Sequence, residues 1–396
     1  MNVLSTQTND QYAAVVLLEK WYRKYSHQFI EISGVVGTGI WEVIQDFVDE
    51  LLDPREVMYL SYDQHQVLEL AAKGFHSYYL NGIIYKYDRV VNFDSLPVIN
   101  PHANGILDYH WIKSVRKKVD AKYRLMVVFD SILLNRQTIN DLGTFGLPVI
   151  LVRDPMLPPA PDSHTFLHEP NIVLREVHPV YARSPIVHFA HKILNGDKLI
   201  PGSYDTVSIV PKKQMNLYNL KSADMIVTIT EDSRAATNSV YRERVMHRKD
   251  TTNVVGERII VMETMYGERL VNPDNKRVKV YLSAGSVGTI SKINRHAAIT
   301  KYVPMNFKPE FYHEEFEELY LDRHYLNGVE TNSRQVVPDE ILKAQYAYAL
   351  TPQLARYGHW DKTTVLIDPS DYPPEIQKAM IYTAITRAQK SATIVI

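Results

Sequence analysis

A glycine-rich turn at residues 34–39 has the spacing of a phosphate-binding loop. It follows an apolar run, FIEIS, and precedes a segment with helical spacing, so backbone N–H groups at a helix N-terminus could hold an anion there. The residues that fit the pattern G-x-x-x-x-G-K-[ST] are Gly34, Gly37, Thr38 and Gly39. A glycine turn in an unrelated α/β fold would have the same sequence, and both interpretations stay open on this segment alone.

The side chains that would do chemistry in such a loop are replaced. Ile40 stands where a lysine would neutralise the β- and γ-phosphates, and Trp41 stands where a hydroxyl would hold Mg²⁺. A second apolar run, LMVVF, ends in Asp130 and Ser131, where an ATP-hydrolysing enzyme has Asp-Glu. Asp130 could still orient Mg²⁺, but a serine cannot polarise the attacking water as a glutamate does.

Three further segments match motifs of one helicase superfamily. Residues 381–388, IYTAITRA, precede the last apolar run and resemble the final superfamily-1 motif, Y-T-A-[IV]-T-R-A. RDPMLPP at 153–159 resembles G-D-P-x-Q-L-P-P without its glutamine, and YAYALT at 346–351 opens a motif whose ending is lost. With these matches the chain resembles the RecD/Dda-like branch of superfamily-1 DNA helicases over nearly its full length. Taken singly, an amphipathic helix would explain the first segment and a proline-rich linker the second.

The resemblance implies roles for the residues at matching positions. It places Arg387 at the arginine that reaches the γ-phosphate and Gln11 at the glutamine that reads adenine. Pro179 stands in place of an arginine finger, and Leu354 lies in the segment 352–361, which lacks the histidine, lysine, glutamine and glutamate that active enzymes carry there. We expect no catalytic residue, because the hydrolytic positions are lost at Ile40, Trp41, Ser131, Pro179 and Leu354. The residues that could still bind a nucleotide are Gln11, Gly34, Gly37, Thr38, Gly39, Asp130 and Arg387.

A segment of mixed aromatic and basic residues, FHSYYLNGIIYKYDR at 75–89, supplies the candidates for contact with DNA. Its start resembles the family segment T-x-H-S that borders single-stranded DNA, and aromatic rings beside cations can stack on bases. The DNA-binding candidates are Phe75, His76, Tyr78 and, after the YAYAL run, Thr351. A helix and a hairpin packed on the first domain would explain the aromatic residues equally well.

The elements that would position these residues alternate along the chain. Continuous apolar runs at 56–61, 123–129 and 147–152 are typical of strands buried on both faces, and helical spacings separate them. This alternation predicts parallel α/β sheets. Together with this alternation, the resemblance to helicases implies an α/β protein with two RecA-like, P-loop NTPase-type domains and a small SH3-like β-barrel inserted in the second.

The barrel is predicted from a change in the sequence pattern after about Val255, where short segments of alternating apolar and polar residues lie between turns. A proline-rich break at 155–163 marks the first domain boundary. The expected domains are 1–163, with a hairpin insertion near 80–110, then 164–254 together with 336–396, and the barrel at 255–335.

Composition excludes several other classes. The 396 residues carry a net charge of −1, so no global basic field advertises nucleic-acid binding. There is no cysteine, and His188 and His191 lack nearby carboxylates, so we expect no metal site. No apolar run is long enough to cross a bilayer and the N-terminus lacks a secretion signal, which predicts a cytoplasmic protein.

The leading hypothesis is a catalytically inactive helicase-like protein that acts as a binding or scaffolding subunit in DNA replication, recombination or transcription. Its expected partners are other protein subunits, with single-stranded DNA as a further candidate, and no cofactor is expected. The alternative is a divergent ATP-dependent 5′→3′ DNA helicase, which would need ATP and Mg²⁺. Compact relatives of this branch occur in phages, which makes a phage origin a working guess.

Overall fold

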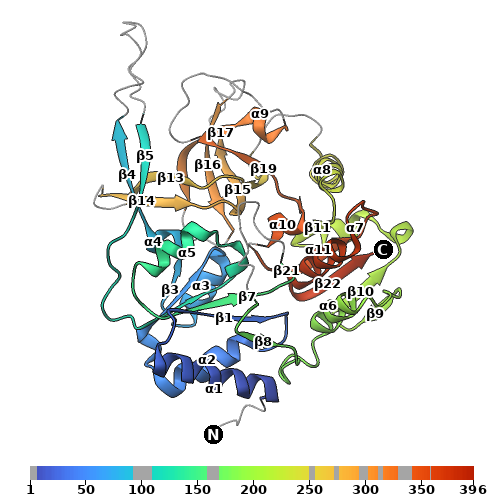
Figure 1. The fold of residues 1–396 in the computed structure, drawn as a ribbon. Coiled ribbons are helices and arrows are strands. Elements are labelled where there is room, and N and C mark those ends of the chain that lie inside the picture. The colour runs from blue at the N-terminus through green and yellow to red at the C-terminus, as the bar shows by residue number, and fades with distance from the viewer. Residues whose placement is uncertain are drawn as a thin grey trace, which may run out of the picture. The chain divides into compact units, whose positions relative to one another are not determined.

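The computed structural model describes residues 7–91, 109–157, 169–248, 255–271, 276–293, 302–310, 315–328, 341–356 and 358–396. Its contacts divide the chain into two compact units, drawn in Figure 1. Unit 1 consists of Met1–Ile84, Lys117–His247 and Ala349–Ile396, and unit 2 consists of Tyr85–Arg116 and Arg248–Tyr348. Most of the proline-rich break predicted at 155–163 lies outside the described residues.

The first sheet of unit 1 is a parallel sheet of six strands. Their spatial order is β3 (Ser77–Tyr79), β2 (Val57–Ser61), β6 (Leu125–Val128), β7 (Val149–Arg153), β1 (Phe29–Gly34) and β8 (Ile172–Leu174). The accompanying helices are α1 (Asn9–Lys24), α2 (Ile40–Leu51), α3 (Gln64–Ala72), α4 (Leu80–Ile84) and α5 (Arg136–Gly143), with short 3₁₀ turns η1 (Pro54–Glu56) and η2 (Ser131–Leu133). Every residue of β2 and β6 is buried, as their unbroken apolar runs predict.

The second sheet of unit 1 is parallel except for its edge strand β9. Its spatial order is β20 (Ala349–Leu350), β11 (Met225–Thr228), β21 (Trp360–Leu366), β22 (Ala388–Val395), β10 (Val207–Val210) and β9 (Gly202–Tyr204). Its helices are α6 (Pro185–Asn195), α7 (Leu217–Lys221), α8 (Glu231–Val240), α10 (Pro352–Ala355) and α11 (Pro374–Thr386), with short turns η3 (Lys212–Gln214) and η4 (Tyr241–Val245).

The two sheets have the same topology. When the edge strands β8 and β9 are set aside and the others are numbered along the chain within each sheet, both sheets have the spatial order 3-2-4-5-1. Five parallel strands wound in one order, with helices between them, form a RecA-like α/β unit. The predicted fold class of two RecA-like units is therefore confirmed by the topology.

Unit 2 contains a β-barrel. The strands that follow one another around it are β18 (Ile341–Leu342), β17 (Phe316–Asp322), β16 (Tyr302–Pro309), β15 (Val287–Ile293), β12 (Arg258–Val261) and β19 (Ala344–Tyr346). Because only Lys343 separates β18 from β19, the first and last strands are one continuous segment and the sheet closes on itself. A β-carbon on Gly288 would lie 2.6 Å from Phe307 Cζ, so β15 and β16 pack closely only with glycine there.

Two hairpins and a short helix complete unit 2: β4 (Tyr85–Val91) with β5 (Tyr109–Val115), β13 (Met265–Val271) with β14 (Lys276–Leu282), and α9 (Arg323–Leu326). The hairpin of β4 and β5 is grouped with the barrel in unit 2. β18 and β19, at residues 341–346, supply the closing hydrogen bonds of the barrel. The domain boundaries expected from the sequence stay a prediction.

Candidate functional site

A cavity of about 400 Å³ lies in unit 1 beside the turn at residues 34–39, which we call the phosphate loop. It opens at the carboxyl ends of β1, β6 and β7, the edge of a parallel sheet where ligands bind in α/β folds. We call it the loop cavity. Its lining includes the phosphate loop, Ile40, Trp41, Glu42, Asp63, Phe129, Asp130, Asp154, Tyr181, Arg356, His359 and Arg387.

The phosphate loop has the backbone that its glycines predict. Gly37 and Gly39 adopt φ of 84° and 76°, a left-handed conformation that side chains disfavour. Gly39 is the N-cap of α2 and no side chain caps the helix, so the first turn of α2 begins at the cavity. The Thr38 hydroxyl donates to the carbonyl of Val35 at 2.8 Å and therefore stabilises the loop itself. The role of this loop toward a nucleotide stays a prediction.

Trp41 turns its indole into an aromatic cluster. Its ring centroid lies 5.1 Å from that of Phe75, 5.6 Å from that of Tyr59 and 6.2 Å from that of Phe129. Ile40, beside it, packs against the hydrophobic core of the first sheet. Both side chains that follow the phosphate loop, Ile40 and Trp41, are therefore packed apolar groups.

Asp130 lines the cavity directly after β6, in a left-handed conformation with φ of 52°. Burial, reinforced by the nearby carboxyl of Asp63, raises the pKa of Asp130 to about 6, although Arg387 and Arg356 act in the opposite direction. Asp154, after β7, also has its pKa raised to about 6 by burial, against the hydrogen bond from Tyr382. Each carboxyl group therefore gains a proton, and with it a hydrogen-bond donor, as pH falls through about 6.

The Ser131 hydroxyl is hydrogen-bonded to the carboxyl group of Glu31 and does not reach the loop cavity. Its hydroxyl donates to Glu31 Oε1 at 3.3 Å, and Arg153 Nη1 lies 3.5 Å from the same oxygen. Burial raises the pKa of Glu31, and the charge of Arg153 partly offsets that effect. Ser131 is buried and is not among the residues that line the cavity.

Two buried arginines supply the positive charge of the cavity. Arg387 Nη1 donates to the carbonyl of Arg356 at 3.1 Å and Nη2 donates to Thr386 Oγ1 at 3.2 Å, while its Nε finds no partner among the described residues. Arg387 was identified from its motif. Arg356 was not, because a single arginine in a segment that departs from the family pattern carries no spacing signal. Tyr181 was missed for the same reason.

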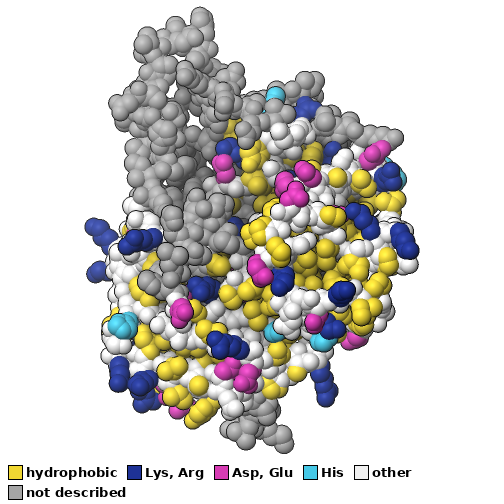
Figure 2. All heavy atoms as spheres, turned by 45° about the vertical axis from the view of Figure 1, so that its right-hand side comes forward, with side chains coloured by type: hydrophobic (Ala, Val, Ile, Leu, Met, Phe, Trp, Pro, Cys, Tyr) yellow, Lys and Arg dark blue, Asp and Glu magenta, His cyan; other side chains and the backbone are white. Residues whose placement is uncertain are grey.

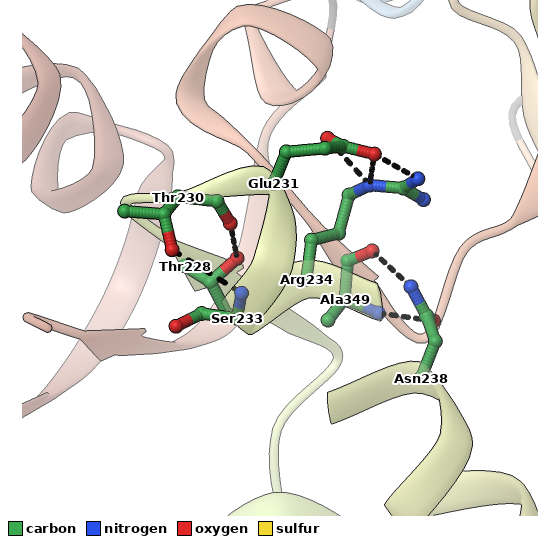
Figure 3. Close-up of polar contacts among 7 residues, drawn as sticks. All are labelled: Thr228, Thr230, Glu231, Ser233, Arg234, Asn238 and Ala349. Carbon is green, nitrogen blue, oxygen red and sulfur yellow. Dashed lines mark hydrogen bonds and ion pairs between the residues drawn. The ribbon is translucent and has the colours of Figure 1, made fainter. Parts of the chain in front are cut away.

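The position of Arg356 depends on α8. Figure 3 shows Asn238 on that helix, whose side-chain amide exchanges two hydrogen bonds of 2.9 Å with the backbone of Ala349. Earlier in α8, Arg234 Nε donates to Glu231 at 2.8 Å, and Thr230 caps the helix through Ser233 N–H. Ala349 begins β20, which leads directly into α10 and Arg356. The amide of Asn238 therefore fixes the strand that delivers this arginine.

Three other predicted residues, Gln11, Pro179 and Leu354, do not line the loop cavity. The side chain of Gln11 is buried; its carbonyl accepts from Thr8 N–H and its amide donates to the carbonyl of Thr38, both at 2.9 Å. Pro179 is exposed in a turn, and Leu354 is half-buried in α10. Neither Pro179 nor Leu354 is among the residues that line the cavity.

The candidates for DNA contact are engaged within unit 1. Phe75 belongs to the aromatic cluster, and His76 Nδ1 and Tyr78 Oη lie 2.9 and 2.6 Å from the hydroxyl of Tyr123. Thr351 is buried at the N-cap of α10. Their side chains therefore support the fold, and their role toward DNA stays a prediction. Within the described residues no group of three or more histidines and carboxylates could hold a metal ion, and no helix is long and apolar enough to cross a membrane.

No protein-family model and no curated protein matches the sequence. Among solved structures, a Pif1 helicase from Bacteroides in complex with ADP-AlF3 and ssDNA is 12% identical, with a TM-score of 0.44 over 98% of this chain and 92% of that one. A Pif1 helicase from Candida albicans is 13% identical, with a TM-score of 0.42 over 100% and 94%. Similarity at this level transfers no ligand and no residue role to this chain.

Proposed function

We propose that this chain is a helicase-like protein that no longer hydrolyses ATP and acts as a binding subunit of a nucleic-acid-processing complex. The observation that carries the proposal is the position of Trp41, whose indole packs with Phe129 beside the loop cavity. At this position a phosphoryl-transfer enzyme holds Mg²⁺ through a hydroxyl. An aromatic cluster offers no ligand to Mg²⁺, so a triphosphate would lack its counter-ion here.

The charges that line the cavity support the same conclusion. Four carboxyl groups, those of Glu42, Asp63, Asp130 and Asp154, face two guanidinium groups, those of Arg356 and Arg387. A triphosphate adds further negative charge, which active enzymes balance with a lysine and Mg²⁺. Burying such a charge without those partners is strongly unfavourable. We therefore expect nucleotide binding to be weak at neutral pH.

Water activation is the third missing part. Ser131 stands where a glutamate would polarise the attacking water, and its hydroxyl is committed to Glu31. A positioned general base contributes roughly 10²–10⁴-fold to a rate, and losing it together with the metal leaves no efficient route to hydrolysis.

A divergent active ATP-dependent 5′→3′ helicase is the second candidate. It is favoured by one observation, that Asp130, Arg356 and Arg387 line the same cavity as the phosphate loop. Two arginines could stabilise a transferring phosphoryl group in place of the missing lysine. This candidate requires turnover that depends on Asp130.

The two candidates are separated by steady-state ATPase measurements on the purified chain, with Mg²⁺ and with and without single-stranded oligonucleotide. The Asp130→Asn variant measures contaminating activity, because it removes the carboxyl at the position where the resemblance to helicases places a metal-orienting aspartate. We expect the same turnover from both proteins, at the background of the assay. Turnover that is stimulated by DNA and abolished by Asp130→Asn would establish the active helicase instead.

The nature of the binding partner needs a separate experiment. On the described part of the face shown in Figure 2, acidic and basic side chains lie interspersed among hydrophobic ones. We therefore propose protein subunits as the main partners and single-stranded DNA as an additional ligand. Fluorescence anisotropy with a labelled oligonucleotide should show binding that weakens as salt is raised, since phosphate contacts release counter-ions. Absence of binding even at low salt removes the DNA component.

A further inference from the structure

The phosphate loop is held through its backbone by residues that follow β8 in the chain. The N–H of Val36 donates to the hydroxyl of Tyr382, on α11, at 2.7 Å. His191, on α6, reaches the carbonyl of the same residue through Nε2 at 2.9 Å, and the N–H of His178 donates to the carbonyl of Gly37 at 2.8 Å. Three backbone groups at the centre of the loop, the N–H and the carbonyl of Val36 and the carbonyl of Gly37, therefore have hydrogen-bond partners.

The Tyr382 hydroxyl both accepts and donates a hydrogen bond. Besides accepting from Val36, its hydroxyl donates to Asp154 Oδ2 at 2.6 Å, and Asp154 Oδ1 accepts from Met156 N–H at 2.9 Å. Tyr382 is fully buried. Burial and the adjacent carboxyl of Asp154 raise the pKa of Tyr382 well above its usual value of 10.0, so the phenol stays protonated and remains a donor.

The packing around the loop leaves little room for another arrangement. A β-carbon on Gly37 would lie 2.6 Å from Val187 Cγ1, on the face of α6 that carries His191. Beside it, the Tyr181 hydroxyl donates to Glu42 Oε1, in the first turn of α2, at 2.7 Å. Val187 and Tyr181 therefore contact the phosphate loop at Gly37 and the first turn of α2 at Glu42.

The N–H groups of a phosphate loop normally point at phosphate oxygens. We propose that Tyr382 is an intramolecular clasp, whose hydroxyl takes the place of a phosphate oxygen on Val36 N–H and keeps the loop closed against α11. An anion that reached this N–H would have to displace the hydroxyl of Tyr382. The displacement would leave Asp154 Oδ2 without the donor that it has in the structure. The clasp is thus an autoinhibitory contact. It does not depend on the loss of hydrolysis, because a clasp of this kind would also restrain an active loop.

Amide hydrogen exchange, resolved to single residues, tests the clasp directly. In the native protein the Val36 amide should exchange slowly, because its hydrogen is bonded to a buried oxygen. In Tyr382→Phe the aromatic ring stays and only the hydroxyl is lost, and we expect the Val36 amide to exchange about tenfold faster or more, as the loss of one buried hydrogen bond implies.

Tyr348→Phe is a matched control in unit 2. The Tyr348 hydroxyl donates to Glu257 Oε2 at 2.7 Å and accepts from Arg258 N–H at 3.3 Å, so it has the same chemistry as Tyr382. This variant should accelerate exchange at Arg258 and leave Val36 unchanged.

Three results would overturn the proposal. The first is exchange at Val36 that stays within twofold, roughly, of the native rate in a folded Tyr382→Phe protein. The second is equal acceleration at Val36 in both variants, which would indicate a global loss of stability. If Tyr382→Phe fails to fold, the native protein still decides, because a Val36 amide that exchanges at the rate of an unprotected amide contradicts the clasp. ATPase turnover is a separate measurement, so a failure here is distinguishable from a failure of the proposed function.

Discussion

Acidification should stabilise unit 1 through the two buried carboxyl groups of the loop cavity. Asp130 and Asp154 have pKa values raised to about 6 by burial, against a usual value of 3.8. The folded protein therefore binds their protons more tightly than the unfolded chain does. The resulting contribution to stability is fully present below pH 3.8 and is lost as pH rises through 6, so ionisation at neutral pH costs free energy of folding.

The expected size follows from the same shift. A difference of about two pKa units corresponds to about 3 kcal/mol for one group at neutral pH. Between about pH 7.5 and about pH 5, one such group should gain roughly 1 to 1.5 kcal/mol of stability. Because part of the raised pKa of Asp154 comes from the charge of Asp130, the two together should gain less than twice that amount.

The assay is urea unfolding, followed by circular dichroism at several pH values, of the native chain and of Asp154→Asn. Asparagine keeps an oxygen that accepts from Tyr382 but cannot ionise, and its amide nitrogen cannot accept from Met156 N–H as Asp154 Oδ1 does. The stability of the variant relative to the native chain should therefore fall by about 1 kcal/mol between about pH 7.5 and about pH 5, whatever its value at the higher pH. Comparison of the two proteins cancels the titration of groups whose pKa does not depend on Asp154. Parallel stability curves, or an advantage that grows on acidification, would refute the reasoning.

Three further predictions concern packing and hydrogen bonds, each measured as a change in the free energy of unfolding. Trp41→Ala should cost about 2–3 kcal/mol by removing a half-buried ring from the aromatic cluster, and a cost below about 0.5 kcal/mol would show that the indole is not packed. Asn238→Ala should cost about 1–3 kcal/mol because both backbone groups of Ala349 lose their partner, and a neutral effect would contradict the bonds in Figure 3. Gly288→Ala should destabilise the barrel by about 1–3 kcal/mol through the clash with Phe307, and an unchanged barrel would remove that steric argument.

The sequence predicts the elements whose signal is local. Continuous apolar runs predicted β2, β6 and β7. The phosphate loop could be predicted from Gly37 and Gly39, because both adopt a positive φ that only glycine adopts freely. The order of the strands in space was implied only through the resemblance to a helicase family. A small barrel was predicted, but the segment that closes it was not, because β18 and β19 pair with β17 and β12 at opposite ends of one sheet.

The part of the site that escaped prediction is made by residues far apart in the chain. Trp41 was singled out from the sequence, but its aromatic neighbours come from three separate segments: Tyr59 lies in β2, Phe75 precedes β3 and Phe129 follows β6. Tyr382 belonged to a recognised motif, yet nothing local indicates that its hydroxyl reaches Val36, 346 residues earlier in the chain. Spacing arguments find side chains on one element, and they do not find contacts that exist only after two sheets have folded together.

The most direct test of the central claim is ATP turnover by the purified chain with Mg²⁺ and single-stranded DNA, measured beside Asp130→Asn. A cavity lined by Trp41 and Phe129, with four carboxyl groups and no lysine from the loop, predicts that the two proteins are indistinguishable. DNA-stimulated turnover in the native chain that disappears in the variant would contradict it.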